Sequence, residues 1–255
     1  MTLRYLLASL LCVFTLSLTA QVDCQGPDFN NDSIIGAADI IVFLTYYGNE
    51  WPLAPEFVCG ETIAHQDYAY STVQIGDQCW FSENCRYLPG VSPSDEGSET
   101  EPLYYVHGYQ GTDVEAAKST DNFNNYGVLY NFQAATLEGL CPSGWHVPTD
   151  LEWTQLTDYL GGASVAGYVM KSTSGWDDNG NGSNSSGFTG LPGGYRGDYY
   201  GGFFYLNDYA YFWSSSVLDD SHVFSRRLSF NYDFVYTPNI FTRGNAASIR
   251  CIKSL

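Results

Sequence analysis

Basic side chains are scarce in this chain of 255 residues. Ten lysines and arginines stand against 28 aspartates and glutamates, and the formal net charge is −18. Nucleic acids and anionic membrane surfaces are bound by clusters of positive charge, so this balance argues against both as partners. The same acidity suits a protein that stays soluble and binds cations.

Long apolar runs are missing beyond the first twenty residues. No later stretch of the sequence approaches the roughly 18 apolar residues of a transmembrane helix, so no membrane span is expected. Residues 1–20, MTLRYLLASLLCVFTLSLTA, combine a positive start at Arg4, a short apolar run and the small residue Ala20. This pattern predicts a secretory signal peptide and a location outside the cell or at its surface.

The chain has no CxxC pair and no cysteine spacing typical of a zinc site. Of its seven cysteines, Cys12 lies in the signal segment, and the remaining even number predicts disulfides in an exported protein. Structural disulfides are therefore favoured over metal-binding or catalytic thiols. Several pairings are open, and the expected ones are Cys24–Cys59 in the N-terminal part, Cys79–Cys85 as a local bridge and Cys141–Cys251 in the main domain.

No familiar catalytic pattern is present either. The four histidines are scattered and form no HxH or HExxH pair. His146, within GWHVPT, is expected to be a hydrogen-bonded structural residue at the start of a helix. Asp150 and Glu152 are spaced as helix-capping residues, so they do not indicate a glycosidase carboxylate pair. These features favour a non-catalytic protein.

The segment DFNNDSIIGAAD carries oxygen ligands at the spacing of a calcium loop. Asp28, Asn30 and Asp32 occupy loop positions 1, 3 and 5. Ile34 at position 7 would supply a backbone carbonyl, and Asp39 at position 12 a carboxylate. These residues predict one bound calcium ion. The alternative is an Asx-rich turn that caps a helix without any metal.

The residues after this loop, IIVFLTYYG, place apolar side chains on one helical face, and Gly48 fits the helix end. Loop and helix together resemble one dockerin repeat, D-x-N-x-D-G-x-[VI]-x-x-x-D-[IL], with Ser33 in place of its glycine. This EF-hand-like resemblance implies calcium binding. A full dockerin pairs two repeats and this chain has one, so docking of a partner through it is kept as an alternative.

Composition divides the chain into four parts. We expect the signal peptide at 1–20, the dockerin-like calcium loop and helix at 21–51, a linker at 52–65 and the main domain at 66–255. The linker is indicated by two prolines and a polar run.

Two local patterns stand out in the main domain. TVQIGDQCWF alternates between polar and apolar residues and turns at Gly76-Asp77, which predicts a β-hairpin. Thr149 and Glu152 form a capping box before an apolar face, which predicts a helix over 149–160. Short strands and glycine-rich loops are expected after this helix.

Six motifs of the main domain occur in a recognisable order: TVQIGDQCWFSENCRYLP, YGVLYNFQAA, CPSGWHVPTDLEWTQLTDYLGG, GFTGLPGGYR, YFWSSS and SIRCIK. With them the chain resembles the Fibrobacter succinogenes major paralogous domain family over residues 66–253. The order GWxxPTxxEW, WSS and RC is also similar to formylglycine-generating, sulfatase-modifying domains. That likeness implies an α+β, C-type-lectin-like fold with short helices, a small twisted antiparallel sheet and long loops. It keeps a divergent sulfatase-modifying enzyme as an alternative function.

Aromatic residues are concentrated in residues 195–213, where ten of nineteen positions are Tyr, Phe or Trp. Such rings, interleaved with Gly, Asp and Asn, suit stacking on a sugar or docking of an extracellular protein. The candidate ligand-binding residues are Tyr195, Arg196, Tyr199, Tyr200 and Tyr209. The alternative is that alternate rings fill the core of a glycine-rich sheet.

The loop WDDNGNGSN offers a weaker cation pattern. Asp177, Asn179 and Asn181 alternate, but no carboxylate follows at position twelve, so a polar turn is favoured. The sequence as a whole predicts an exported, disulfide-stabilised, non-catalytic binding module.

Overall fold

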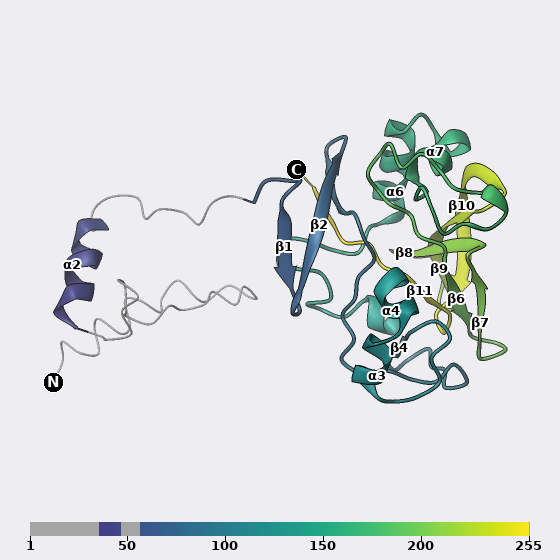
Figure 1. Cartoon of the computed structure of the whole chain (residues 1–255), viewed down its shortest axis with the longest axis horizontal. Helices are drawn as coiled ribbons and strands as arrows, with labels where there is room; N and C mark the ends of the chain where they lie inside the picture. The colour runs from purple at the N-terminus through teal and green to yellow at the C-terminus, as the bar shows by residue number, and fades with distance from the viewer. Residues whose placement is uncertain (1–35, 47–56, 255) are drawn as a thin grey trace. The chain divides into compact units, whose positions relative to one another are not determined.

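The computed structural model describes residues 36–46 and 57–254 (Figure 1). The chain divides into two units, residues 1–57 and 58–255. Within the described residues, no helix is long and apolar enough to span a membrane. Several expectations fall outside these residues: the signal peptide, Cys24 and the proposed calcium ligands Asp28, Asn30, Asp32 and Ile34.

Helix α2 (Ala37–Tyr46) belongs to the first unit and lies where the sequence predicts a helix. Asp39 is in its first turn, and its buried carboxylate accepts a hydrogen bond of 2.6 Å from the backbone N–H of Gly36. A carboxylate is stabilised there because the first N–H groups of a helix lack partners within it.

A four-stranded antiparallel sheet joins the two ends of the second unit. Its order is β1-β2-β3-β12, and the strands are Thr62–His65, Tyr68–Ile75, Gln78–Phe81 and Ile252–Ser254. The β2–β3 hairpin turns at Gly76-Asp77, which confirms the predicted turn. Strand β1 lies in the stretch expected to be a linker. It forms there because its backbone pairs with the edge of β2. Residues 62–65 of the expected linker thus belong to a strand.

A larger sheet forms the rest of the unit. Its order is β10-β9-β8-β6-β11-β5-β4, and β7 pairs with β6 beside this path. Strands β6 and β8 are parallel, and the other pairs are antiparallel. The strands are β4 (Tyr104–Tyr105), β5 (Leu129–Asn131), β6 (Gly193–Gly197), β7 (Gly202–Leu206), β8 (Tyr209–Val217), β9 (His222–Ser229), β10 (Tyr232–Thr242) and β11 (Ala246–Ala247).

Short helices connect these strands. They are α3 (Val114–Lys118), α4 (Asp121–Tyr126), α5 (Phe132–Ala135), α6 (Asp150–Tyr159), α7 (Ala163–Met170) and the 3-10 turn at Asp177–Asn179. The predicted capping box is present, because Thr149 accepts from the N–H of Glu152 while Glu152 accepts from the N–H of Thr149. Helices α6 and α7 lie against strands β8 to β10 (Figure 1).

The main core lies between these helices and the inner face of β8 and β9. Trp80, Trp153, Phe188 and Phe212 are buried there, with ring centroids 4.8 to 5.8 Å apart in adjacent pairs. On β8, Ala210 and Phe212 belong to this inner core. Because side chains alternate along a strand, the neighbouring tyrosines of β8 point to the opposite, outer face. The fold is therefore α+β, dominated by sheets with a few short helices.

Two disulfides lie in the described part of the chain, Cys59–Cys79 and Cys141–Cys251. The second is the expected pair, and the first corrects the sequence prediction. Cys79 on β3 reaches Cys59, so the expected bridges Cys24–Cys59 and Cys79–Cys85 do not form. Cys85 is close to Cys79 in sequence, but it is a buried free thiol whose sulfur lies 3.8 Å from the Tyr70 hydroxyl.

Candidate functional site

Arg196, one of the five candidate ligand-binding residues, is a structural side chain. It is 1% exposed, and it donates to the carbonyl of Ser94 at 2.8 Å and to that of Gly244 at 3.0 Å. It also pairs with Asp198 at 3.5 Å. The sequence prediction for Arg196 is wrong, because β6 turns this side chain into the protein, where it ties three loop segments together.

Tyr199 and Tyr200 are the most exposed of the five. They lie in the turn between β6 and β7 and are 89% and 80% exposed, with ring centroids 4.7 Å apart and planes nearly perpendicular. Their rings are accessible, but they are separate from the main group of aromatic side chains.

Tyr195 and Tyr209 belong to a broader surface on the outer side of the large sheet, which we call the tyrosine face. Its members are Tyr195, Tyr205, Tyr209, Tyr211, Tyr236 and Arg227, from strands β6 to β10. Strand register places Arg227 directly between Tyr211 on β8 and Tyr236 on β10. Such cross-strand neighbours on one face are close enough to interact.

The rings of the tyrosine face form a connected row. The ring centroid of Tyr195 lies 6.0 Å from that of Tyr205 and 5.0 Å from that of Tyr211. The ring centroid of Tyr209 lies 4.9 Å from that of Tyr205 and 6.0 Å from that of Tyr211. Tyr205 is 48% exposed and Tyr211 only 4%. Burial raises the pKa of Tyr211 to about 12, against the hydrogen bond and charge of Arg227, which act to lower it. The phenol at the floor of this face is therefore uncharged at neutral pH.

An unusual backbone conformation adds Tyr205 to this face. Alternation along β7 would place Phe204 and Tyr205 on opposite sides. Yet both rings lie beside the ring of Tyr195, with centroid distances of 5.6 Å for Phe204 and 6.0 Å for Tyr205. Tyr205 has a φ of 60°, in the left-handed region that a residue with a Cβ atom adopts at a cost of about 1–3 kcal/mol. This break in alternation brings its ring beside Tyr209.

Gly194 allows β6 and β7 to approach closely beneath these rings. Its φ is 64°, and a Cβ atom there would lie 2.2 Å from the carbonyl oxygen of Phe204. Only glycine fits both this backbone conformation and this contact.

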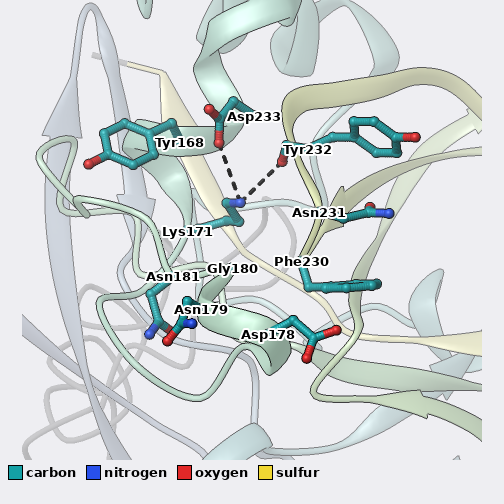
Figure 2. Close-up of a pocket in the computed structure, with 10 residues that line it drawn as sticks. All are labelled: Tyr168, Lys171, Asp178, Asn179, Gly180, Asn181, Phe230, Asn231, Tyr232 and Asp233. Atoms are coloured by element: carbon teal, nitrogen blue, oxygen red, sulfur yellow. Dashed lines mark hydrogen bonds and ion pairs between the residues drawn. The ribbon is translucent and has the colours of Figure 1, made fainter.

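A groove of about 530 Å³ lies beside the turn between β9 and β10 (Figure 2). It is lined by Tyr168, Lys171, Asp178, Asn179, Gly180, Asn181, Phe230, Asn231, Tyr232 and Asp233. Two groove residues lie near rings of the tyrosine face. The ring centroid of Phe230 is 6.3 Å from that of Tyr209, and the ring centroid of Tyr232 is 6.4 Å from that of Tyr236. These contacts place the groove next to the tyrosine face.

Lys171 organises the groove. Its buried ammonium donates to the carbonyl oxygens of Ser229 and Tyr232, each at 3.1 Å, and pairs with Asp233 at 3.6 Å (Figure 2). Burial lowers the pKa of Lys171, while the charge of Asp233 acts to raise it. With these partners, the lysine holds the β9–β10 turn against α7 and is a structural residue.

The opposite wall of the groove is the loop that the sequence indicates as a polar turn. A Cβ atom at Gly180 would lie 2.1 Å from the carbonyl oxygen of Phe230, so glycine is required for the loop to pack there. Burial, followed by the charges of Asp177 and Asp178, raises the pKa of Asp208. The carboxyl groups of Asp177, Asp178 and Asp208 are therefore close to one another at this end of the surface. Sequence reasoning missed the groove because its two walls are about 50 positions apart.

The comparison with known families agrees with the motifs. The family model of the Fibrobacter succinogenes major domain matches residues 73–253. The chain belongs to this family. The match spans the tyrosine face, the groove and the Cys141–Cys251 disulfide. No curated protein and no solved structure matches the chain.

His146 and Glu152 of this Fibrobacter succinogenes major domain form a contact between a histidine and a carboxylate at the start of α6. His146 contacts Glu152 at 2.7 Å, but the other carboxylate oxygen of Glu152 accepts from the N–H and hydroxyl of Thr149 in the capping box. Burial alone would raise the pKa of Glu152, and these hydrogen bonds lower it overall. The carboxylate is thus held ionised as part of the helix cap.

Cys85 is a buried free thiol. Burial raises the pKa of the Cys85 thiol, whereas a nucleophilic cysteine needs a lowered pKa. In the part of the chain that the structure describes, no group of three or more His, Cys, Asp or Glu side chains is placed to hold a metal ion. The tyrosine face and the groove are therefore the strongest candidate site.

Proposed function

We propose that the chain is an exported, disulfide-stabilised, non-catalytic module that binds a glycan on the tyrosine face. The observation that carries this proposal is the connected row of tyrosine rings on the outer side of the large sheet. Tyrosine offers a broad contact area at low cost in side-chain entropy, and its hydroxyl adds a hydrogen bond. Sugar rings have apolar faces that stack on such rings and hydroxyl groups that need polar partners.

The adjoining groove supports a glycan over a protein as the ligand. It combines the aromatic side chains of Tyr168, Phe230 and Tyr232 with the polar side chains of Asn179 and Asn231. A few polar groups among aromatic walls are typical of small-molecule and saccharide sites. A polysaccharide lying along the tyrosine face would reach this groove with its next sugar units.

The experiment is binding of the purified, exported chain to an array of glycans, followed by affinity measurement with the strongest ligand. Tyr209→Ala should weaken binding by about 5- to 30-fold, equivalent to about 1–2 kcal/mol. Tyr159→Ala is the matched control, since Tyr159 is a 67% exposed tyrosine on α6. Equal losses in both variants, or no glycan bound by the parent chain, would contradict the proposal.

Export is part of this proposal and is supported by the signal-like segment 1–20 and by two disulfides. We also propose the C-type-lectin-like architecture within the α+β class, for which the support is the order of sequence motifs. The sulfatase-modifying alternative is less favoured, because Cys85 is buried with a raised pKa. Alkylation of native protein with iodoacetamide tests this point, and rapid labelling of Cys85 would favour an enzyme.

One calcium ion in the first unit completes the proposal. Its ligands would be Asp28, Asn30, Asp32, the Ile34 carbonyl and Asp39. The support is the ligand spacing and the position of Asp39 in the first turn of α2. Calorimetry should detect calcium binding that is lost in the variant Asp28→Ala/Asp39→Ala. Unchanged calcium binding in that variant would contradict the site. Capture of the chain by a cohesin would favour the alternative in which this unit docks a partner.

A further inference from the structure

The arginines of the second unit differ in their polar partners. Arg226 pairs with Asp150 at 2.6 Å and Arg86 with Glu83 at 3.4 Å, while Arg250 donates to buried carbonyl groups. Arg196 and Arg243 also donate to carbonyl oxygens. Among the described residues, no carboxylate lies within ion-pair distance of Arg227.

Arg227 has aromatic neighbours instead. The centre of its guanidinium lies 3.5 Å from the centroid of the Tyr236 ring and 5.2 Å from that of Tyr209. It also hydrogen-bonds to the hydroxyl of Tyr211, which burial keeps protonated. Cation–π contacts offset part of the cost of burying a cation, but uncharged rings and phenols do not neutralise it. This half-buried cation therefore has no carboxylate partner among the described residues, in a chain of net charge −18.

We propose that Arg227 binds the carboxylate of a uronic acid unit in a glycan stacked on the tyrosine face. This inference rests on the proposed glycan-binding function and narrows its ligand to an acidic polysaccharide. The planar guanidinium matches a carboxylate geometrically, and hydrogen bonds between ionised groups are the stronger kind. The Tyr236 ring fixes the plane of the guanidinium, which reduces the entropy lost when the carboxylate binds.

The acidic side chains at the groove favour one orientation of the glycan on the surface. The groove carries Asp178 and Asp233, and Asp177 and Asp208 are close to it. Lys171, the cation of the groove, is already paired with Asp233 and with two carbonyl groups. A second carboxylate would be repelled there. The surface therefore fits a glycan with its acidic unit over Arg227 and a neutral unit in the groove.

The test compares acidic polysaccharides with their own neutral forms. Polygalacturonate, alginate and glucuronoxylan are each used before and after chemical reduction of the carboxyl groups, with the full exported chain and sodium as the only added cation. At least one acidic form should bind roughly tenfold more tightly than its reduced form, because one charge-assisted contact is lost on reduction. This preference should weaken as salt is raised.

Arg227→Gln should remove the preference for the acidic form, so that the variant binds the acidic and the reduced form about equally. Lys118→Gln on α3 is the matched control, because it removes one cation from an exposed position. Arg227→Lys, which keeps the charge without the planar fork, should retain part of the preference. Thermal melts of all three variants establish that each is folded.

The outcomes separate this inference from the proposed function. Equal binding of acidic and reduced forms by the parent chain, or a preference that survives in Arg227→Gln, would overturn the role of Arg227 and leave glycan binding intact. Absence of binding to every polysaccharide would overturn both. Poly-glutamate is included as a further probe, and Arg227-dependent binding to it alone would identify an acidic protein segment as the ligand and refute the glycan.

Discussion

The two faces of the large sheet use aromatic residues in opposite ways. The inner face carries Phe212, packed against Trp153 and Phe188, and all three side chains are fully buried. The outer face carries tyrosines such as Tyr205 and Tyr209, whose rings are partly exposed. Phenylalanine has no polar atom to leave unsatisfied in a core, whereas the tyrosine hydroxyl stays hydrated or hydrogen-bonded at a surface. Aromatic content alone therefore does not distinguish core from binding surface.

The largest expected difference between the two faces is in stability. Phe212→Ala should lower the free energy of unfolding by about 3–5 kcal/mol, because it leaves a cavity in a closely packed core. Tyr209→Ala should lower it by less than about 1.5 kcal/mol, since solvent already reaches that ring. Urea denaturation measures both variants. A loss of similar size for Tyr209→Ala would mean that the outer tyrosines are core residues.

Neighbouring arginines on β9 provide a second comparison. Arg226→Met removes the partner of Asp150 and should cost on the order of 2–4 kcal/mol. Arg227→Met leaves no carboxylate without its ion-pair partner and should cost less than about 1 kcal/mol. Thermal unfolding of the two variants in parallel tests this. Equal destabilisation would show that Arg227 is as structural as Arg226, and would weaken its assignment to a ligand.

Alkaline pH tests the burial of the Tyr211 phenol at the floor of the tyrosine face. The pKa of Tyr211 is raised to about 12 when folded, from the ordinary value near 10, so the folded state holds its proton more tightly. The contribution of Tyr211 to stability is therefore complete below about pH 10 and is lost as pH rises from about 10 to 12. Tyr211→Phe should show a shallower decline of stability across this range. An identical decline in parent and variant would argue that solvent reaches Tyr211.

The smallest expected effect concerns the backbone at Tyr205. With a φ of 60°, this position disfavours any residue with a Cβ atom. Tyr205→Gly should therefore be more stable than Tyr205→Ala by about 1 kcal/mol, although both lose the ring. Chemical denaturation of the pair measures this difference. If alanine is the more stable of the two, the break in alternation on β7 is not present in solution.

Short-range patterns were read correctly from the sequence. The capping box of Thr149 and Glu152 predicts helix α6, and the turn at Gly76-Asp77 predicts the β2–β3 hairpin. Both depend on residues within a few positions of each other. The family resemblance, which rests on six motifs in order, is confirmed by the family match.

The candidate site was only partly predictable. The aromatic segment was recognised, and Tyr195 and Tyr209 do lie on the tyrosine face. Arg196 was misplaced, since its position in a strand does not reveal which side meets a loop from elsewhere in the chain. Arg227 was missed, because nothing near it in sequence marks it as unpaired.

The sequence by itself determined the local elements, the family and the abundance of tyrosine, because caps, turns and motifs act over a few residues. The tertiary structure alone decided three features: the Cys59–Cys79 bridge, the burial of Arg196, and the contact of Tyr211, Arg227 and Tyr236. Each depends on the order and register of strands that are remote in the chain. Those in turn are set by the packing of the whole core, which no short stretch of sequence encodes.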